Sequence, residues 1–352
     1  MNAADQNASQ ERARAAQAAG VPADRPRAAT PMTATVTVDI AGAQMGGAAR
    51  FSIELHRYLS RTGRQDIRVI GAARNVGPAW LVRRDITRPS RGRRVALNNV
   101  SFVAPGSERW TLLRNALHFL TDDEFARLDR PLRAATMREA AVVRLAARRA
   151  DVLVVPSTAM ADRVTRILPR ARSRITVRPH PVSADAIPRL PRDPAILCPV
   201  LFAPYKHMTQ RLTELLEAIE DHTDASVRVR VTADRCDVTP ELACSPRIEF
   251  VGQLDQHELC QLWGRSRAIY FPTGIESFGY PLAEARASGQ PVIARDTGQN
   301  REIAGPALCG FIPGDRASLR RALERALRIE PVPDPVPFDP DAYFHWLLGP
   351  QR

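Results

Sequence analysis

The stretch from residue 270 to 294, YFPTGIESFGYPLAEARASGQPVIA, constrains the fold of this chain more than any other part of the sequence. The apolar run at 268–271 is typical of a buried strand, and the Pro-Thr-Gly at 272–274 breaks it. Pro281 suits the first position of a helix, and no β-branched residue follows it until a Gly-Gln-Pro ends the helical pattern. Because another apolar run begins at 292–294, the stretch predicts a strand, a turn, a helix and a second strand.

The turn before this helix is a favourable place for an anion. The first N–H groups of a helix lack backbone partners, and the helix dipole is positive at that end. Two carboxylates bracket the turn in an E-x7-E spacing, with Glu276 in the turn and Glu284 about one helical turn inside the helix. We therefore expect a diphosphate at the turn, with each glutamate near another polar part of the same ligand. The alternative is an amphipathic helix whose glutamates face water.

The register of the whole stretch resembles the signature E-x-FG-x-P-x-x-E-A-x-x-x-G-x-PV of the retaining, nucleotide-sugar-dependent GT-B glycosyltransferases of family 4. The resemblance implies an α/β fold of two facing Rossmann-like domains with a cleft between them. It also implies a catalytic role for Glu276, which would hydrogen-bond the donor sugar, while Glu284 would bind the ribose hydroxyls. The turn residues that would bind the donor are Ser277, Phe278, Gly279 and Tyr280. The matching residues are Glu276, Phe278, Gly279, Pro281, Glu284, Ala285, Gly289, Pro291 and Val292.

Lys206 is the only lysine among 50 basic residues, and the other 49 are arginines. A preference for arginine this strong should have replaced a lysine that has no role. Lys206 therefore indicates a need for a compact ammonium group at this position. The alternative is that this lysine survived by chance. It matches the lysine that the same family places against the donor diphosphate, which makes it the second catalytic candidate. The family's neighbouring arginine is missing, because Leu201 and Phe202 stand in its place. Either Arg211 or an arginine of the N-terminal half replaces it, or phosphate binding is weaker.

The N-terminal half contains a series of predicted strands whose ends carry glycine or polar residues. The strand at 33–40 precedes Gly46 and Gly47, which resemble the glycine pair that faces the cleft in this family. Ligands of parallel α/β sheets lie at the carboxyl ends of strands, so polar residues there are candidates for the acceptor side. The family has a histidine at about the position of Asn115, and whether Asn115 or His118 serves is open. The block at 150–157 resembles the family's AD-x-hydrophobic-x-x-x-S segment, which closes the N-terminal domain, and 176–182 should be the last strand of that domain with its exit loop. Further strands are predicted at 66–72, 95–99 and 110–114, with Asn98, Asn99, Arg114, Asn115 and His118 at the ends of the last two.

The C-terminal half should begin with a buried strand at 195–203. The strand and turn at 248–254 resemble the segment whose backbone contacts the nucleotide base, which makes Gly252 a donor-binding candidate. The aromatic segment at 343–348 should pack back on the N-terminal domain, because exposing it would be costly. The Asp-Pro-Asp at 339–341 is expected to be a turn and helix cap rather than a metal site. Helices are predicted at 133–149, 211–221 and 317–329.

The length of 352 residues favours two domains, because single cores rarely grow beyond about 250 residues. No apolar run of about 18 residues is present, and the N-terminal segment lacks the apolar region of a signal peptide, so we expect a cytoplasmic protein. The five cysteines show no metal-site spacing and are expected to be reduced, and no metal or other cofactor is expected. The predicted divisions are a disordered tail at 1–33, an acceptor-side domain at 34–190, a nucleotide-sugar domain at 191–330, and a proline-rich connector and terminal segment at 331–352.

Positive charge is concentrated in the N-terminal half. Residues 1–190 hold 32 arginines and 16 acidic residues, a net charge of +16, whereas residues 191–352 hold 18 basic and 22 acidic residues, a net charge of −4. This asymmetry favours an anionic partner, such as a peripheral contact with the inner face of an anionic membrane. Solvated helix faces are the alternative. A nucleic-acid partner is not expected, because aromatic residues are only 6% and no stacking motif is evident.

The sequence therefore predicts a hexosyltransferase that moves sugar from a nucleotide-diphosphate sugar to a lipid, glycan or small-molecule acceptor. The family resemblance implies retention of anomeric configuration. Lys206 and helix N–H groups, rather than a metal, would stabilise the leaving diphosphate. The alternative is a GT-B scaffold that no longer catalyses and binds a partner or a membrane surface, which the missing arginine favours and the two glutamates oppose.

Overall fold

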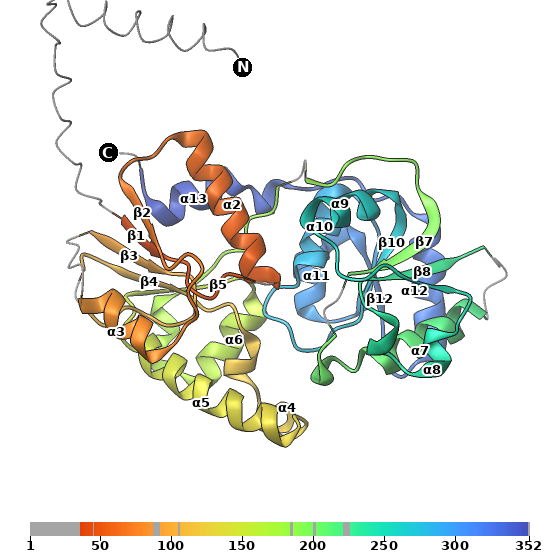
Figure 1. The fold of residues 1–352 in the computed structure, drawn as a ribbon, viewed down its shortest axis with the longest axis horizontal. Coiled ribbons are helices and arrows are strands. Elements are labelled where there is room, and N and C mark those ends of the chain that lie inside the picture. The colour runs from red at the N-terminus through yellow and green to blue at the C-terminus, as the bar shows by residue number, and fades with distance from the viewer. Residues whose placement is uncertain are drawn as a thin grey trace, which may run out of the picture. The chain divides into compact units, whose positions relative to one another are not determined.

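The structure is a computed structural model that describes residues 36–350, apart from residues 45, 87–91, 105, 184–185, 200–201 and 221–225. Within this range, the chain forms two parallel sheets of six strands each (Figure 1). The tail predicted at 1–33 and the position of Leu201 lie outside the described residues. None of the helices in the described range is long and apolar enough to cross a membrane.

The first sheet confirms the strands predicted in the N-terminal half, and its β5 lies within the block at 150–157. Its strand order is β2-β1-β3-β4-β5-β6, and all neighbours pair in parallel. Parallel pairing requires a crossover between strands, so all carboxyl ends lie at one edge of the sheet. The strands are β1 (Val36–Asp39), β2 (Ile67–Ile70), β3 (Arg93–Ala96), β4 (Arg109–Leu112), β5 (Val152–Val155) and β6 (Ile175–Val177).

Helices cover both faces of the first sheet. One core joins α2 (Gly46–Thr62) and α13 (Pro340–Leu348) to the side of β5 that carries Val154. The other core joins α5 (Arg130–Ala147) and α6 (Thr158–Ile167) to Leu153 and Val155. This alternation is the period of two that a strand imposes on its side chains. The remaining helices of this half are α3 (Pro78–Ile86) and α4 (Asp122–Ala126).

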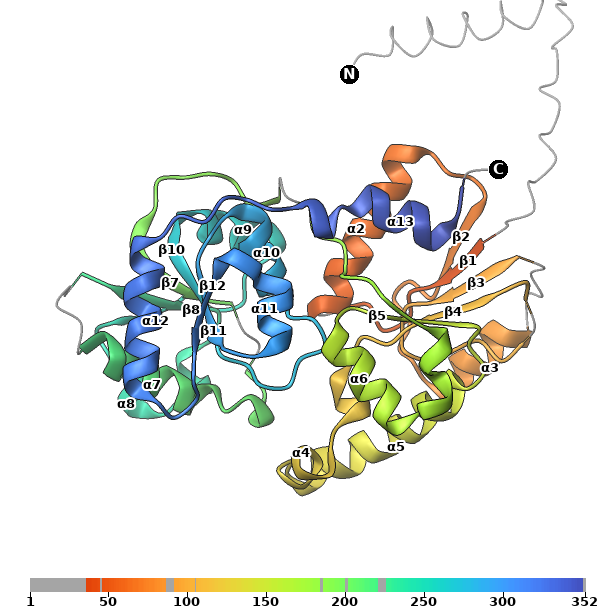
Figure 2. The same cartoon turned by 180° about the vertical axis from the view of Figure 1, so that it is seen from behind.

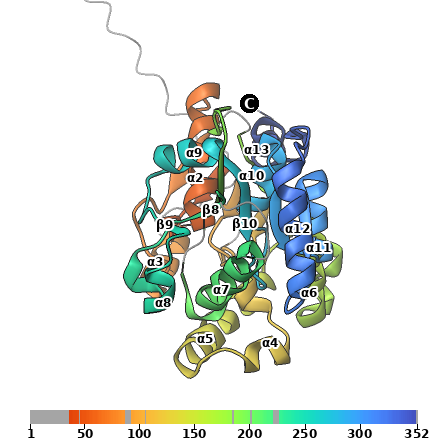
Figure 3. The same ribbon diagram turned by 90° about the vertical axis from the view of Figure 1, so that its right-hand side faces the viewer.

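The second sheet has the order β12-β11-β10-β7-β8-β9 and is also parallel throughout. Its helices share one core with the strands, and α7 packs against α12 (Figure 3). The strands are β7 (Asp193–Cys198), β8 (Arg228–Val231), β9 (Ile248–Phe250), β10 (Ser266–Phe271), β11 (Val292–Arg295) and β12 (Leu308–Phe311). The helices are α7 (Met208–Glu220), α8 (Pro240–Ala243), α9 (Gln256–Arg265), α10 (Tyr280–Ser288), α11 (Gly298–Ala304) and α12 (Arg316–Arg328).

The chain's C-terminal helix returns to the first sheet, as predicted. Figures 1 and 2 show α13 beside α2, and Tyr343 and Phe344 pack edge-to-face on Phe51 of α2 at 5.6 and 5.5 Å between ring centroids. Asp339 caps α13, because its carboxylate accepts hydrogen bonds from the backbone N–H groups of the next turn. The Asp-Pro-Asp segment is thus a helix cap.

The bounds of the first strand of the C-terminal half differ from those predicted. The sequence predicted a strand at 195–203, whereas β7 begins at Asp193, includes Pro194 and ends at Cys198. Proline is tolerated at the beginning of a strand, where the ladder hydrogen bond that it cannot donate matters least. All five cysteines are free, as predicted, with Cys198, Cys260 and Cys309 buried.

Candidate functional site

A cavity of about 370 Å³ lies where the carboxyl ends of β4 and β10 meet the first turns of α2 and α10. It brings together most of the residues that the sequence selected, although they come from five separate segments of the chain. Gly252, His118 and Glu284 are not among its lining residues. The predicted residues that line it are Gly46, Gly47, Asn99, Arg114, Asn115, Lys206, Glu276, Ser277, Phe278, Gly279 and Tyr280, and they are joined by His180.

The first turn of α10 opens into this cavity. Gly279, at the N-cap, has a φ of 80°, a left-handed conformation that favours glycine. A Cβ at this position would lie 2.9 Å from Cδ1 of Leu282 and 3.0 Å from Cε1 of Phe271, so any larger residue would also collide. No side chain caps the helix. Pro281 has no N–H and Leu282 donates its N–H to the carbonyl oxygen of Gly279 at 2.9 Å, so the anion site expected here rests on the positive end of the helix dipole and the remaining N–H groups of the first turn.

Lys206 and Glu276 face each other in the cavity. Lys206 ends a short 3-10 helix at Pro204–Lys206 after β7, and its Nζ lies 3.3 Å from Oε1 of Glu276. Both side chains keep some exposure, 15% and 24% respectively, so a ligand can reach them. The adjacent Tyr205 is shielded from water, and its burial, together with Glu276, raises the pKa of the phenol to about 12. Two opposite charges thus stand beside the turn that precedes α10.

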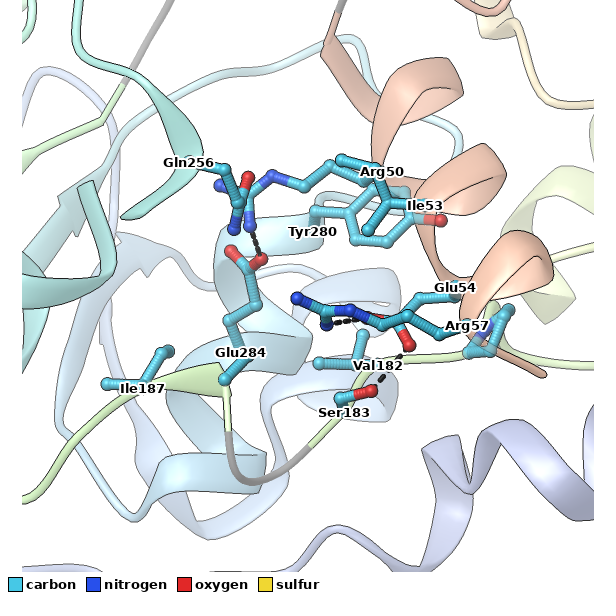
Figure 4. A pocket seen from close by; sticks show the side chains of 12 residues that line it. Arg50, Ile53, Glu54, Arg57, Val182, Ser183, Ile187, Gln256, Tyr280 and Glu284 are labelled. Atoms are coloured by element: carbon cyan, nitrogen blue, oxygen red, sulfur yellow. Dashed lines mark hydrogen bonds and ion pairs between the residues drawn. The ribbon is translucent and has the colours of Figure 1, made fainter. Parts of the chain in front are cut away.

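Glu284 pairs with Arg50 of α2 in a smaller pocket next to the main cavity (Figure 4). The pair uses Oε1, while the buried Oε2 has no hydrogen-bond partner among the described residues. Burial raises the pKa of Glu284, and the neighbouring Arg50 opposes that effect. The sequence did not identify Arg50, because 234 positions separate the two residues. Glu284 retains one free carboxylate oxygen for a further hydrogen-bond donor.

Ser277 fixes the E-x-FG turn to loops of the first sheet. Its Oγ donates to the carbonyl oxygen of Arg114 at 2.5 Å, and its own carbonyl oxygen accepts from Oγ of Ser157 at 2.9 Å. Ser277, which the sequence predicted to bind the donor substrate, therefore uses its hydroxyl group to hold the turn in position. A second connection joins Thr158 to Glu302 through backbone and side-chain hydrogen bonds of 3.0 to 3.1 Å.

The structure separates the two acceptor-side candidates. Asn115 lines the cavity and its Oδ1 accepts from the N–H of Leu117 at 3.0 Å, which begins a 3-10 helix. His118 is buried beneath it, 5% exposed, with Nε2 at 3.4 Å from Nδ2 of Asn115 and 3.5 Å from Glu139. Burial lowers the pKa of His118, although Glu139 opposes the shift. Asn115 is therefore the residue that a ligand in the cavity can contact directly.

Two arginines, Arg211 and Arg114, are candidates to replace the phosphate-site arginine that this chain lacks. Arg211 forms an ion pair with Glu214 at 2.8 Å and does not line the cavity. Arg114, two residues beyond β4, does line it. The sequence had named Arg114, at the end of its strand, as one of the candidates for the cleft. Among the described residues, no group of three or more His, Cys, Asp or Glu side chains is arranged to hold a metal ion.

Comparison with known proteins relates the chain to enzymes that act on sugars. Residues 239–335 match the family model described as Glycosyl transferases group 1. The chain is 33% identical over 90 residues to D-inositol 3-phosphate glycosyltransferase of Frankia alni, covering 25% of this chain and 22% of that protein. It is 29% identical over 191 residues to glycogen synthase of Mycobacterium tuberculosis, covering 51% and 46%. The matches thus span less than half of these relatives.

The fold has a counterpart among solved structures. Sucrose-phosphate synthase of Thermosynechococcus elongatus superposes with a TM-score of 0.57 over 89% of this chain and 93% of that chain. The sequence identity is 15%, so this likeness concerns the fold alone. It confirms the predicted arrangement of two parallel α/β sheets.

Proposed function

We propose that the chain is a glycosyltransferase, and the proposal is supported by the match of residues 239–335 to the glycosyl transferases group 1 model and by the two parallel α/β sheets of the fold. It would transfer a hexose from a nucleotide-diphosphate sugar to a lipid, glycan or small-molecule acceptor. The observation that carries the proposal is the meeting of Lys206, Glu276 and the uncapped first turn of α10 around one cavity. These groups supply the cation, carboxylate and N–H donors that a sugar diphosphate requires.

In the proposed complex, the donor diphosphate lies at the first turn of α10. Negative charge grows on it as the glycosidic bond breaks, and Lys206 and the positive end of α10 would stabilise that charge. Glu276 would accept hydrogen bonds from hydroxyls of the donor sugar. The free Oε2 of Glu284 would accept a ribose hydroxyl while Arg50 holds Oε1.

Retention of configuration and independence from metal belong to the same proposal. The family resemblance supports retention. Independence from metal is supported by Lys206 and the α10 N terminus, which provide positive charge where the leaving group would develop its negative charge. We expect turnover to persist after treatment with EDTA, and a loss that added Mg²⁺ or Mn²⁺ restores would contradict this part.

The test is a screen of nucleotide sugars with the purified protein. Release of nucleoside diphosphate, measured together with mass spectrometry of the products, should identify at least one donor that is hydrolysed or transferred. Nuclear magnetic resonance of the anomeric proton of a transfer product then reports retention or inversion. Binding of a nucleotide sugar without turnover for any acceptor class would favour the non-catalytic scaffold, and absence of binding would contradict both.

A further inference from the structure

Four buried polar atoms near the cavity have no hydrogen-bond partner among the described residues: Nε of Arg114, Nδ1 of His180, and the hydroxyl oxygens of Tyr280 and Tyr343. His180 and Tyr343 are each only 2% exposed. Buried polar atoms in folded proteins are nearly always paired, and an unpaired one calls for an explanation such as a ligand. Four of them around one cluster indicate a site built for a group that the protein itself does not provide.

The side chains that carry these four atoms lie in or beside one cluster of aromatic rings around Phe51. The guanidinium carbon of Arg114 lies 5.0 Å from the centroid of the Phe51 ring. The Phe51 ring packs edge-to-face on His180 at 5.3 Å and on Tyr343 at 5.6 Å. His180 stacks on Tyr280 at 6.0 Å. Arg114, His180 and Tyr280 all line the main cavity, so a ligand there can reach these residues.

Charge gives the second observation. No carboxylate within the described residues contacts the Arg114 guanidinium, whereas Lys206 in the same cavity has Glu276 at 3.3 Å. Burial lowers the pKa of Arg114, and burial together with Arg114 lowers the pKa of His180 well below its usual value. Arginine nonetheless stays protonated in proteins. The cavity therefore contains a shielded cation that has no counter-ion among the described residues, next to a histidine whose burial disfavours its protonated form.

We propose that Arg114 anchors an oxyanion site in this cavity and binds a phosphoryl group, with the Tyr280 hydroxyl as a further donor. The planar guanidinium presents paired N–H groups that match phosphate oxygens. The inference rests on the proposed function, because the phosphoryl group would come from the donor diphosphate or from a phosphorylated acceptor. Arg114, from the first sheet, would supply the phosphate-binding arginine that is absent from the loop before Lys206.

The test compares three variants by calorimetry. Arg114→Gln removes the cation, and Tyr280→Phe removes only a hydroxyl that makes no hydrogen bond in the protein, so the second change should leave folding intact. Arg178→Gln is the matched control, because Arg178 stacks on Trp346 of the same aromatic cluster at 4.7 Å but does not line the cavity. The probes are ADP, UDP and GDP, inorganic pyrophosphate and inorganic phosphate. Thermal unfolding of each variant reports its folding.

Removal of the Arg114 charge should weaken anion binding at least about tenfold, the usual effect of losing a hydrogen bond between charged groups, and Tyr280→Phe should weaken it severalfold. A loss of nucleoside-diphosphate affinity in Arg114→Gln identifies the donor as the source of the phosphoryl group. Unchanged nucleotide affinity, with loss of phosphate binding to the nucleotide-saturated protein, identifies a phosphorylated acceptor. Retention of wild-type affinity for every probe by Arg114→Gln and Tyr280→Phe, or an equal loss in Arg178→Gln, overturns the proposal.

The same measurements distinguish this inference from the proposed function. If the wild-type protein binds no nucleoside diphosphate but binds pyrophosphate or phosphate in an Arg114-dependent way, the oxyanion site stands and the donor assignment fails. If the protein hydrolyses a nucleotide sugar while Arg114→Gln and Tyr280→Phe bind all probes as wild type does, the proposed function stands and the oxyanion site fails. If the wild-type protein binds none of the five probes, the oxyanion site is also overturned.

Discussion

Nζ of Lys206 and Oε1 of Glu276 lie 3.3 Å apart, so each charge partly neutralises the other. A diphosphate at the α10 N terminus would compete with Glu276 for the ammonium group and leave the carboxylate to a sugar hydroxyl. An ammonium on a four-carbon stem can follow such an exchange, because it is compact and its donors rotate. A guanidinium in the same place is bulkier and directional. The single lysine of this arginine-rich chain thus lies at a position where an ammonium and a guanidinium group should differ in how they bind a diphosphate.

We predict that Lys206→Ala loses nearly all transferase activity and Lys206→Arg loses much of it. Preorganised groups that stabilise a developing charge are typically worth on the order of 10²–10³ in rate. The measurement is kcat with the donor that the nucleotide-sugar screen identifies. Wild-type turnover by Lys206→Arg would make the lone lysine an accident of composition, and full activity of Lys206→Ala would show that the phosphate site is wrongly assigned.

A second residue-scale prediction concerns Glu284 and Arg50. Glu284→Ala should weaken nucleoside-diphosphate affinity by about 1.5–3 kcal/mol, the worth of hydrogen bonds to a charged group. Arg50→Gln should weaken it less, because the ribose would bind the free Oε2 while Arg50 only orients the carboxylate through Oε1. Calorimetry of both variants checks the order. An unchanged affinity in Glu284→Ala removes the ribose role, and a larger loss in Arg50→Gln would point to direct ligand contact by the arginine.

Among the helices, α10 and α13 support the parts of the chain that line the cavity. α10 begins and ends at glycines with positive φ, Gly279 at 80° and Gly289 at 68°, and a Cβ on Gly289 would lie 2.6 Å from the carbonyl oxygen of Pro331. α13 brings Tyr343 and Phe344 onto α2, whose first turn carries Gly46 and Gly47. The terminal helix therefore supports the glycine turn that lines the cavity.

We predict that Phe344→Ala destabilises the protein by about 3–5 kcal/mol, because Phe344 is fully buried between α2 and the first sheet and its removal leaves a cavity. Chemical denaturation monitored by circular dichroism gives the free energy of unfolding. Val332→Ala is the control, since Val332 is 81% exposed in the connector before α13 and should change stability by less than about 0.5 kcal/mol. Equal stability of the two variants would mean that α13 does not contribute to the folded core.

At the scale of the whole molecule, the basic N-terminal half exposes apolar side chains beside arginines. On α5, Val142 is 49% and Leu145 is 65% exposed, and Arg138 and Arg149 are exposed on the same helix or directly after it. Exposed apolar side chains flanked by cations are the combination that favours an anionic lipid surface. Contact with such a surface is the hypothesis that this arrangement supports.

We predict that the protein co-sediments with vesicles containing anionic phospholipid and not with neutral vesicles, and that binding declines as salt screens charges beyond about 8–10 Å. Reversing Arg138 and Arg149 to Glu should reduce the bound fraction. The matched control reverses Arg320 and Arg321, which are exposed on α12 of the other half. Equal partitioning to both vesicle types, or an equal effect of the two charge reversals, would contradict a role for the basic half.

Elements whose signals lie within a short stretch of sequence could be predicted from the residues alone. The strand, break, proline and glycines between 268 and 294 gave β10, α10 and β11 within a few residues, because each signal acts on its own neighbourhood. The same signals placed Glu276 and Gly279 at the cavity. Two strands, β8 and β12, escaped prediction. β8 alternates arginine and valine over four residues, and β12 contains a glycine, so neither pattern is long or apolar enough to be distinctive.

The contacts between side chains that are distant in the sequence could not be predicted from the residues alone. Arg50 reaches Glu284 across 234 positions, and Arg114, His180 and Tyr343 come together from three separate segments around Phe51. The tertiary structure also placed Asn115 in the cavity and His118 beneath it, although both follow the same strand. Local sequence fixes backbone conformation through propensity and periodicity, whereas these contacts depend on how sheets and helices pack over long separations. The partner of a buried charge is therefore settled by the fold and not by the residues next to it.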